Sequence, residues 1–164
     1  MTVNDFRQMY VTEVQELRSV EAQLVDALPK MVEVASHPEL KQAIQSHLED
    51  TRAQRNRLDT VLRRQGTEAR EHMDQSMQAI VREAEKWARM VQDPDLRDAG
   101  LIASAQRVEH YEIAVYGTLA TWAKQLGLDE DERTLHTILD EEKRADEKLS
   151  ALDKRIVNPD AATG

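Results

Sequence analysis

Single acidic residues interrupt the apolar stripes of several predicted helices. Residues spaced alternately three and four positions apart share one face of a helix. On that spacing the inward stripe of residues 10–31 is apolar except for Glu21, and the stripe of residues 135–152 is apolar except for Glu142 and Asp146. A carboxylate on a buried face is costly unless it is paired or binds a metal ion. These positions are therefore candidates for chemistry.

The middle of the chain supplies further candidates of the same kind. Glu109 and Glu112 interrupt two neighbouring apolar stripes of one predicted helix, and His47 lies on the inward stripe of another with Asp50 beside it. Four helices each carry an acidic residue at a similar depth. We therefore predict one shared site and not four independently buried carboxylates. The candidate metal ligands are Glu21, His47, Asp50, Glu109, Glu112, Glu142 and Asp146.

The donor types in this set predict which metals it would hold. Carboxylate oxygens with one imidazole suit iron or manganese better than zinc or copper, and the chain has no cysteine to supply a thiolate ligand. A faint internal repeat relates Ser19-Val20-Glu21-Ala22 to Arg107-Val108-Glu109-His110, and each segment lies on the first helix of a predicted helix pair. Carboxylate bundles that hold two metals are built from such pairs. We therefore predict two metal ions, iron or manganese.

The same residues also have an explanation without metal. The central glutamates can be satisfied by hydrogen bonds from Gln54, Gln106 or Tyr116. His47 can be an ordinary hydrogen-bonded core histidine. Where a metal is bound, Glu112 and Asp146 have an alternative to direct ligation, because they can orient His47 or a ligand water without touching the metal. The sequence leaves a metal site and a buried polar network as alternatives.

Proline, glycine and capping residues divide the chain into five predicted helices. Helix-forming residues are plentiful, and there are only 5 glycines and 4 prolines. The predicted helices span residues 3–35 (bent at Pro29), 38–66, 68–92, 94–127 and 129–157. The start signals are Ser36-His37-Pro38, Asp93-Pro94 and a capping box from Asp129 to Glu132, and Gly66 is a left-handed stop. We predict one all-α domain over residues 1–157 and a disordered tail over residues 158–164.

Charge and hydropathy narrow the class of protein. The net charge of −9 argues against a dedicated nucleic-acid surface. No apolar run approaches the roughly 20 residues that span a bilayer. The first residues also lack the basic and then apolar pattern of a signal peptide. We predict a soluble cytoplasmic protein with no nucleic-acid partner and no membrane partner.

Several segments resemble the YciE/YciF family, a ferritin-like group long described as a domain of unknown function and associated with bacterial stress responses. The segments are Ala27-Leu-Pro-Lys-Met31, His47-Leu-Glu-Asp-Thr51, residues 101–117 and residues 139–149, and Glu109-His110-Tyr111-Glu112 is the most specific motif. The resemblance covers most of the chain. It implies a four-helix bundle with an extra helix crossing between the two helix pairs, and a homodimer. It also implies kinship with rubrerythrins and manganese catalases.

The chain departs from the wider ferritin-like pattern in its metal motifs. The usual Glu-x-x-His is missing from the second and last predicted helices. The second helix offers His47-x-x-Asp50, in which the order is reversed and the acid is shorter, and the last offers Glu142 and Asp146 without a histidine. Glu112 is the extra carboxylate that compensates for the missing imidazole.

Two functional hypotheses follow. In the first, the chain is a dimetal-carboxylate oxidoreductase of the stress response that acts on peroxide, or on O2 and Fe(II). Glu21 and Glu142 are then terminal ligands, Glu109 is a bridge, and His47 with Asp50 completes the second half-site. In the second, the chain is a non-enzymatic dimeric stress-response scaffold with a metal-free buried polar network. A ferritin-type iron-storage cage is disfavoured, because the inserted helix and the short chain fit a dimer better.

Overall fold

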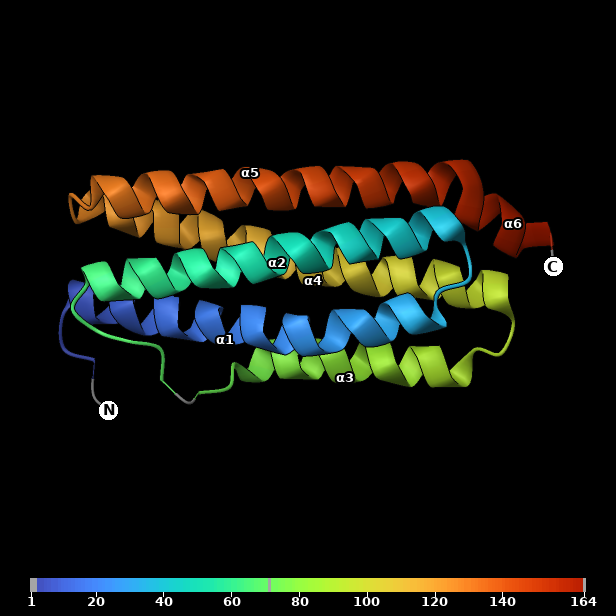
Figure 1. Cartoon of the computed structure of the whole chain (residues 1–164), viewed down its shortest axis with the longest axis horizontal. Coiled ribbons are helices and arrows are strands. Elements are labelled where there is room, and N and C mark those ends of the chain that lie inside the picture. The colour runs from blue at the N-terminus through green and yellow to red at the C-terminus, as the bar shows by residue number, and fades with distance from the viewer. Residues whose placement is uncertain (1–2, 71, 164) are drawn as a thin grey trace.

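The computed structural model describes residues 3–70 and 72–163, and most of them are helical. The long helices are α1 (Phe6–Val34), α2 (Pro38–Arg64), α3 (Gln75–Met90), α4 (Pro94–Gln125) and α5 (Asp129–Leu152). A π-helical turn, η1 (Asp153–Val157), and a short helix, α6 (Asn158–Thr163), follow α5. The described part of the chain contains no strand (Figure 1). The predicted all-α class is confirmed.

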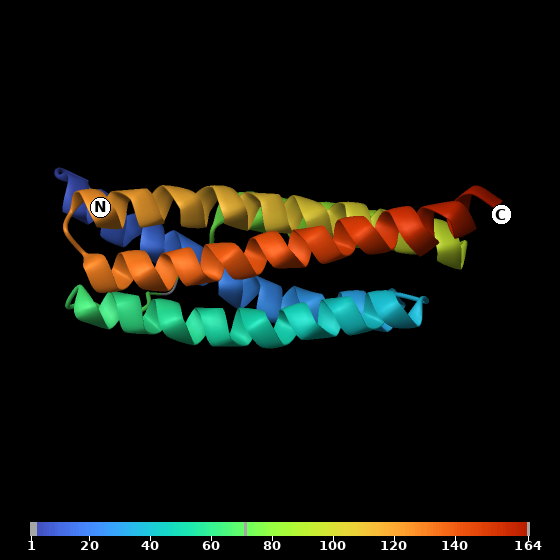
Figure 2. The same cartoon turned by 90° about the horizontal axis from the view of Figure 1, so that it is seen from above.

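Two helical hairpins make the bundle. α1 packs against α2, and α4 packs against α5. The two hairpins lie lengthwise against each other, with further contacts between α2 and α5 and between α1 and α4 (Figure 2). α3 lies outside these four helices, on α1 and α4, and carries the chain from one hairpin to the other (Figure 1). The structure therefore has the four-helix bundle and the crossover helix that the sequence predicted.

The predicted proline, glycine and capping residues set most of the helix ends. Pro38 and Pro94 each occupy the first turn of a helix, where the missing N–H is not needed. Asp93 accepts hydrogen bonds from the backbone of the first turn of α4. Gly66 has a φ of 71°, which confirms the predicted left-handed stop after α2. α1 continues through Pro29.

One predicted helix start and one predicted cap are wrong. α3 begins at Gln75 and not at residue 68, because side chains of α1 hold the backbone at Glu68 and at Asp74. Gln15 Nε2 donates to the carbonyl of Glu68, and Ser19 Oγ accepts from the N–H of Asp74. The predicted capping box at Asp129 does not form either. Asp129 is already helical, and the capping residue is Leu128, whose side chain makes no capping bond.

The segment expected to be a disordered tail is helical as far as Thr163, and Gly164 lies outside the described residues. The wider turn of η1 directs the chain into α6, which packs against α4. Val157 is buried in the core, and Asn158 Nδ2 donates to Asp153 Oδ2 at 2.8 Å. Pro159 is the second residue of α6.

The predicted inward stripes of α1 and α2 are buried throughout. In α1 these residues are Tyr10, Val14, Leu17, Glu21, Leu24, Leu28 and Met31. In α2 they are Leu40, Ile44, His47, Thr51, Gln54, Leu58 and Val61. The apolar side chains of α3 are only partly buried: Met77 and Ala84 are covered, whereas Trp87 is 40% exposed. Among the described helices, α3 packs mainly on α1 and α4, so a narrower face is covered.

Across the described residues, no helix is both long enough and apolar enough to cross a membrane.

Candidate metal centre

Five of the predicted ligands meet inside the bundle. α1 supplies Glu21, α2 supplies His47, α4 supplies Glu109 and Glu112, and α5 supplies Glu142. The glutamates are at most 1% exposed and His47 is 8% exposed. Each lies on the core-facing stripe of its helix, so the helical period brings residues from distant parts of the sequence together. We call these five residues the acidic cluster.

The cluster is compact enough to hold a metal ion. His47, Glu109, Glu112 and Glu142 each offer one donor atom, and these atoms all lie within 4.8 Å of one another. Nε2 of His47 is 3.4 Å from Oε1 of Glu109 and 3.9 Å from Oε2 of Glu112. Glu21 joins from α1, where its Oε1 accepts a hydrogen bond from the hydroxyl of Tyr116.

Most polar atoms of the cluster have no hydrogen-bond partner within the described chain. The unpartnered buried atoms are Oε2 of Glu21, Nε2 of His47, Oε2 of Glu109, both carboxylate oxygens of Glu112 and Oε2 of Glu142. Buried polar atoms are rarely left unpaired, because the lost solvation is costly. Atoms that can accept but find no donor are suited to a cation.

Burial dominates the electrostatics of the site. Burial, followed by the charge of Glu142, raises the pKa of Glu21 to about 8, and burial raises the pKa of Glu142 to about 7. For Glu109 and Glu112 the same cause raises the pKa well above the ordinary value. Burial lowers the pKa of His47 to about 4, so its imidazole is neutral at pH 7 and able to bind a metal. Carboxyls in such a place are neutralised by protons or by a metal ion.

Two predicted ligands are not brought into the cluster. Asp50 is exposed on α2, and its pKa is raised by partial burial and by the neighbouring charge of Glu141. Asp146 is half-buried on α5, where it lies 3.4 Å from both Nε2 of His110 and Nε2 of Gln106. Their positions follow from helix geometry. Asp50 is three residues after His47 and Asp146 is four after Glu142, so each acid lies about one turn along its helix from the cluster member.

Gln54 and Tyr116 complete the surroundings of the cluster. The sequence offered both only as members of a metal-free network. Gln54 Nε2 donates to Oε1 of Glu142 and, at 3.1 Å, to Oε2 of Glu141. Its own Oε1 is buried without a partner. The helical stripe placed Gln54 on the inward face, but an uncharged amide gave no signal of metal chemistry.

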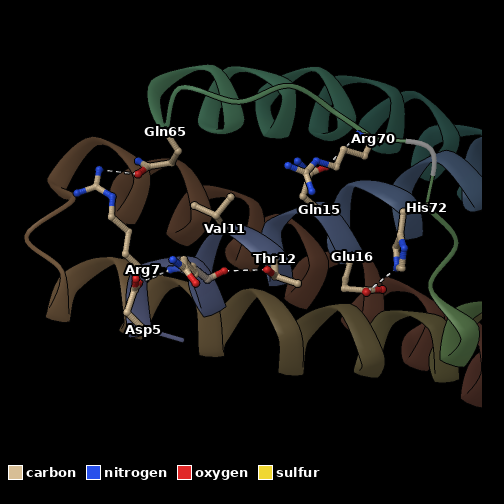
Figure 3. A pocket seen from close by; sticks show the side chains of 10 residues that line it. Asp5, Arg7, Val11, Thr12, Gln15, Glu16, Gln65, Arg70 and His72 are labelled. Carbon is tan, nitrogen blue, oxygen red and sulfur yellow. Dashed lines mark hydrogen bonds and ion pairs between the residues drawn. The ribbon is translucent and has the colours of Figure 1, made fainter. Parts of the chain in front are cut away.

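A surface hollow between α1 and the residues Gln65, Arg70 and His72 is separate from the acidic cluster. Figure 3 shows its polar side chains paired with one another, with Arg7 donating to Gln65 at 2.8 Å and Nε2 of His72 lying 2.5 Å from Oε1 of Glu16. No member of the acidic cluster lines it. The candidate site is therefore the interior cluster and not this hollow.

Comparison with known proteins places the chain in a family. A family model described as "Domain of unknown function (DUF892)" matches residues 5–162. The chain belongs to this family. YciF of Escherichia coli K12 is 38% identical over 162 residues, which is 98% of either chain. The YciF resemblance predicted from the sequence motifs is thereby confirmed.

Solved structures share the architecture of this DUF892 chain. The crystal structure of the E. coli stress protein YciF matches with a TM-score of 0.91 and 37% identity, and covers 95% of this chain and 99% of that one. YcfI of Rhodopseudomonas palustris matches with a TM-score of 0.88 and 38% identity, over 90% and 94% of the two chains. A Xanthomonas campestris protein at 21% identity has the same fold with a TM-score of 0.78. Kinship of the DUF892 chain with rubrerythrins and manganese catalases stays a prediction.

Proposed function

We propose that this chain binds two iron or manganese ions in the acidic cluster and consumes peroxide, or oxidises Fe(II) with O2, during stress. One observation carries the proposal: the buried donor atoms of His47, Glu109, Glu112 and Glu142 lie within 4.8 Å of one another. Oxygen donors with a single neutral imidazole suit iron and manganese. A stress role is supported by the relative in E. coli, which is described as a stress protein.

The residues of the cluster have distinct parts in this proposal. Glu109 and Glu112 lie three residues apart on α4, and neither oxygen of Glu112 has a hydrogen-bond partner among the described residues, so these two carboxylates would hold the ions from the side of α4. Glu21 and Glu142 approach from α1 and α5 as terminal ligands, each with one oxygen already held by Tyr116 or Gln54. Two such ions would supply the electrons exchanged with peroxide or O2. The protons held by the carboxyls would leave as metal binds.

The first test is metal binding by the metal-free protein. We expect Mn(II), or Fe(II) without air, to bind with a dissociation constant in the micromolar range or below, measured by calorimetry. Glu142→Gln should weaken binding strongly because it removes a carboxylate from the cluster. Glu147→Gln is the matched control, since it makes the same change on an exposed position of the same helix. Equal affinities for the two variants would contradict the site, and peroxide consumption by the loaded protein then tests the activity.

A second function is supported by the hydrogen bonds that the cluster already makes. Tyr116 donates to Glu21 and Gln54 donates to Glu142, which is the start of a metal-free network. The chain would then be a non-enzymatic dimeric scaffold of the stress response. Thermal melting separates the two, because a metal at 100 times its dissociation constant stabilises the folded state by about 2.7 kcal/mol. A scaffold would melt at the same temperature with and without metal.

Expectations about partners and location also stay proposals. Exposed apolar side chains in and around α3, with Met73 51%, Trp87 40% and Met90 63% exposed, support a homodimer through this face. Light scattering after size exclusion would show a mass near 38 kDa for a dimer, twice the 18.8 kDa of the chain. The expected lack of nucleic-acid binding and the cytoplasmic location are checked by gel shift and by cell fractionation.

A further inference from the structure

We propose that the cleft between α2, α4 and α5 is the port through which metal ions enter the acidic cluster; this inference rests on the proposed function. The cleft has a volume of about 530 Å³, and His47 and Glu109 are among the residues that line it. The other members of the cluster do not line it. An ion that enters from this side therefore meets His47 and Glu109 first.

The unpartnered imidazole marks this cleft as a route to a ligand. His47 is 8% exposed, its Nε2 has no hydrogen-bond partner, and that atom lies 3.4 Å from Oε1 of Glu109. The apolar groove beside α3 and the hollow of Figure 3 touch neither residue. The two residues thus join the solvent-filled cleft to the closed cluster.

Three alanines are among the residues that line the cleft. Ala43 precedes His47 by four residues on α2, and Ala105 precedes Glu109 by four on α4. Ala145 follows Glu142 by three on α5. Residues three or four apart lie on the same helix face. One alanine on each wall therefore stands a single turn from a cluster residue, where a larger side chain would fill the opening.

The rim of the cleft carries both signs of charge. Glu141 is paired with Arg57 and Glu39 with Arg155, while Arg144 and Lys148 line the same cleft. Asp50 also lines it and is exposed. The sequence predicted Asp50 as a ligand; the cleft gives it a place at the entrance instead. Since the rim charges nearly balance, the size of the opening and not the sign of its field controls passage.

The absence of cysteine allows a direct test of the port. Ala145→Cys gives the protein a single thiol on a half-exposed wall of the cleft, which a bulky aromatic thiosulfonate can cap and a phosphine can restore. Mn(II) is mixed rapidly with metal-free protein, and loading is followed by loss of the free-ion electron paramagnetic resonance signal. Ala151→Cys, exposed on the same helix, is the matched control.

Capping the thiol of Ala145→Cys should slow loading and release alike, by at least about tenfold, with an unchanged dissociation constant. Uncapping should restore the rate, and the capped control should load at the wild-type rate. Ala43→Phe, on the α2 wall of the cleft, is a second blocked variant, which keeps the test valid if the labelled Ala145→Cys fails to fold. It should slow Mn(II) loading in the same way. If Mn(II) loads both blocked variants at the wild-type rate, and the wild type binds Mn(II) normally, the port is overturned and the proposed function stands. Absence of Mn(II) binding to the wild type would overturn the proposed function and the port with it.

Discussion

Gln54 links the buried carboxylates to an ion pair at the surface. Its amide nitrogen donates to Glu142 in the cluster and to Glu141 outside it, and both carboxylate oxygens of Glu141 accept hydrogen bonds from Arg57, at 3.0 and 2.5 Å. These hydrogen bonds outweigh partial burial and keep the pKa of Glu141 below its ordinary value. Arg57 therefore fixes Glu141, Glu141 fixes Gln54, and Gln54 orients Glu142.

Replacing Gln54 should weaken metal binding without removing a charge. Gln54→Leu deletes the donor to Glu142 and a buried carbonyl oxygen that has no hydrogen-bond partner. Loss of a group that orients a metal ligand commonly reduces affinity about 10–100-fold, and we expect a reduction in this range by calorimetry with Mn(II). Gln45→Leu, exposed on the same helix, should bind as the wild type does. Equal affinities for the two variants would show that Glu142 needs no such support.

Residue types and spacing predicted which side chains face inward, and all five members of the cluster were among the predicted ligands. Asp50 and Asp146 show the limit of that reasoning. A helical wheel with a fixed angle per residue cannot tell the centre of the bundle from its edge, because the tilt and rotation of each helix depend on packing against the others. Helical spacing predicted that Gln54 faces inward, but its uncharged amide gave no indication that it orients a candidate metal ligand.

At the scale of the elements, α3 is held at its start by one aspartate. Asp74 is 7% exposed, caps the helix by accepting from the N–H of Met77 at 2.6 Å, and accepts from the hydroxyl of Tyr111 at 3.0 Å. Gln23 donates to its carbonyl at 3.0 Å. The single carboxylate therefore ties α3 to α4, and its backbone ties α3 to α1.

Removing this carboxylate should destabilise the fold and leave the cluster intact. Asp74→Ala loses the cap and the bond to Tyr111, and loss of a capping side chain commonly costs about 0.5–2 kcal/mol. We expect a loss in this range by urea denaturation, with unchanged Mn(II) affinity because α3 supplies no member of the cluster. Tyr111→Phe removes one of the two bonds and should cost less. A large loss of metal affinity in Asp74→Ala would contradict the separation of α3 from the site.

The start of α3 also shows why this element was harder to predict than the others. The sequence Glu68-Ala69-Arg70 favours helix by propensity, yet Gln15 and Ser19 of α1 bind the backbone nearby. Tertiary hydrogen bonds of this kind override local preference and leave no trace in the local sequence. By contrast, Pro38, Gly66 and Pro94 act through their own backbone geometry, and their predicted roles are confirmed.

At the scale of the whole molecule, the cluster makes stability depend on pH and on metal. The pKa of Glu21 is raised from 4.5 to about 8 and that of Glu142 to about 7, so above pH 4.5 the folded protein holds protons that the unfolded chain has lost. The stabilisation that comes from holding these protons is complete below pH 4.5 and is lost as the pH rises through 7 and 8. His47, with its pKa lowered to about 4, acts in the opposite sense, but only below pH 6.5.

Between pH 6.5 and 8.5 the titration of Glu21 and Glu142 therefore controls how stability depends on pH. The melting temperature of the metal-free protein should fall as the pH rises through this interval. Binding of Mn(II) replaces their protons, so the metal competes better as the pH rises. We expect the increase in melting temperature caused by Mn(II), measured without air, to grow over the same interval in which the metal-free protein loses stability. Glu142→Gln lacks one of the titrating groups. In this variant the melting temperature of the metal-free protein, and the increase caused by Mn(II), should both change less with pH. Melting curves whose separation does not change with pH would mean that the protons and the metal do not share a site, and the metal would have to bind elsewhere on the molecule.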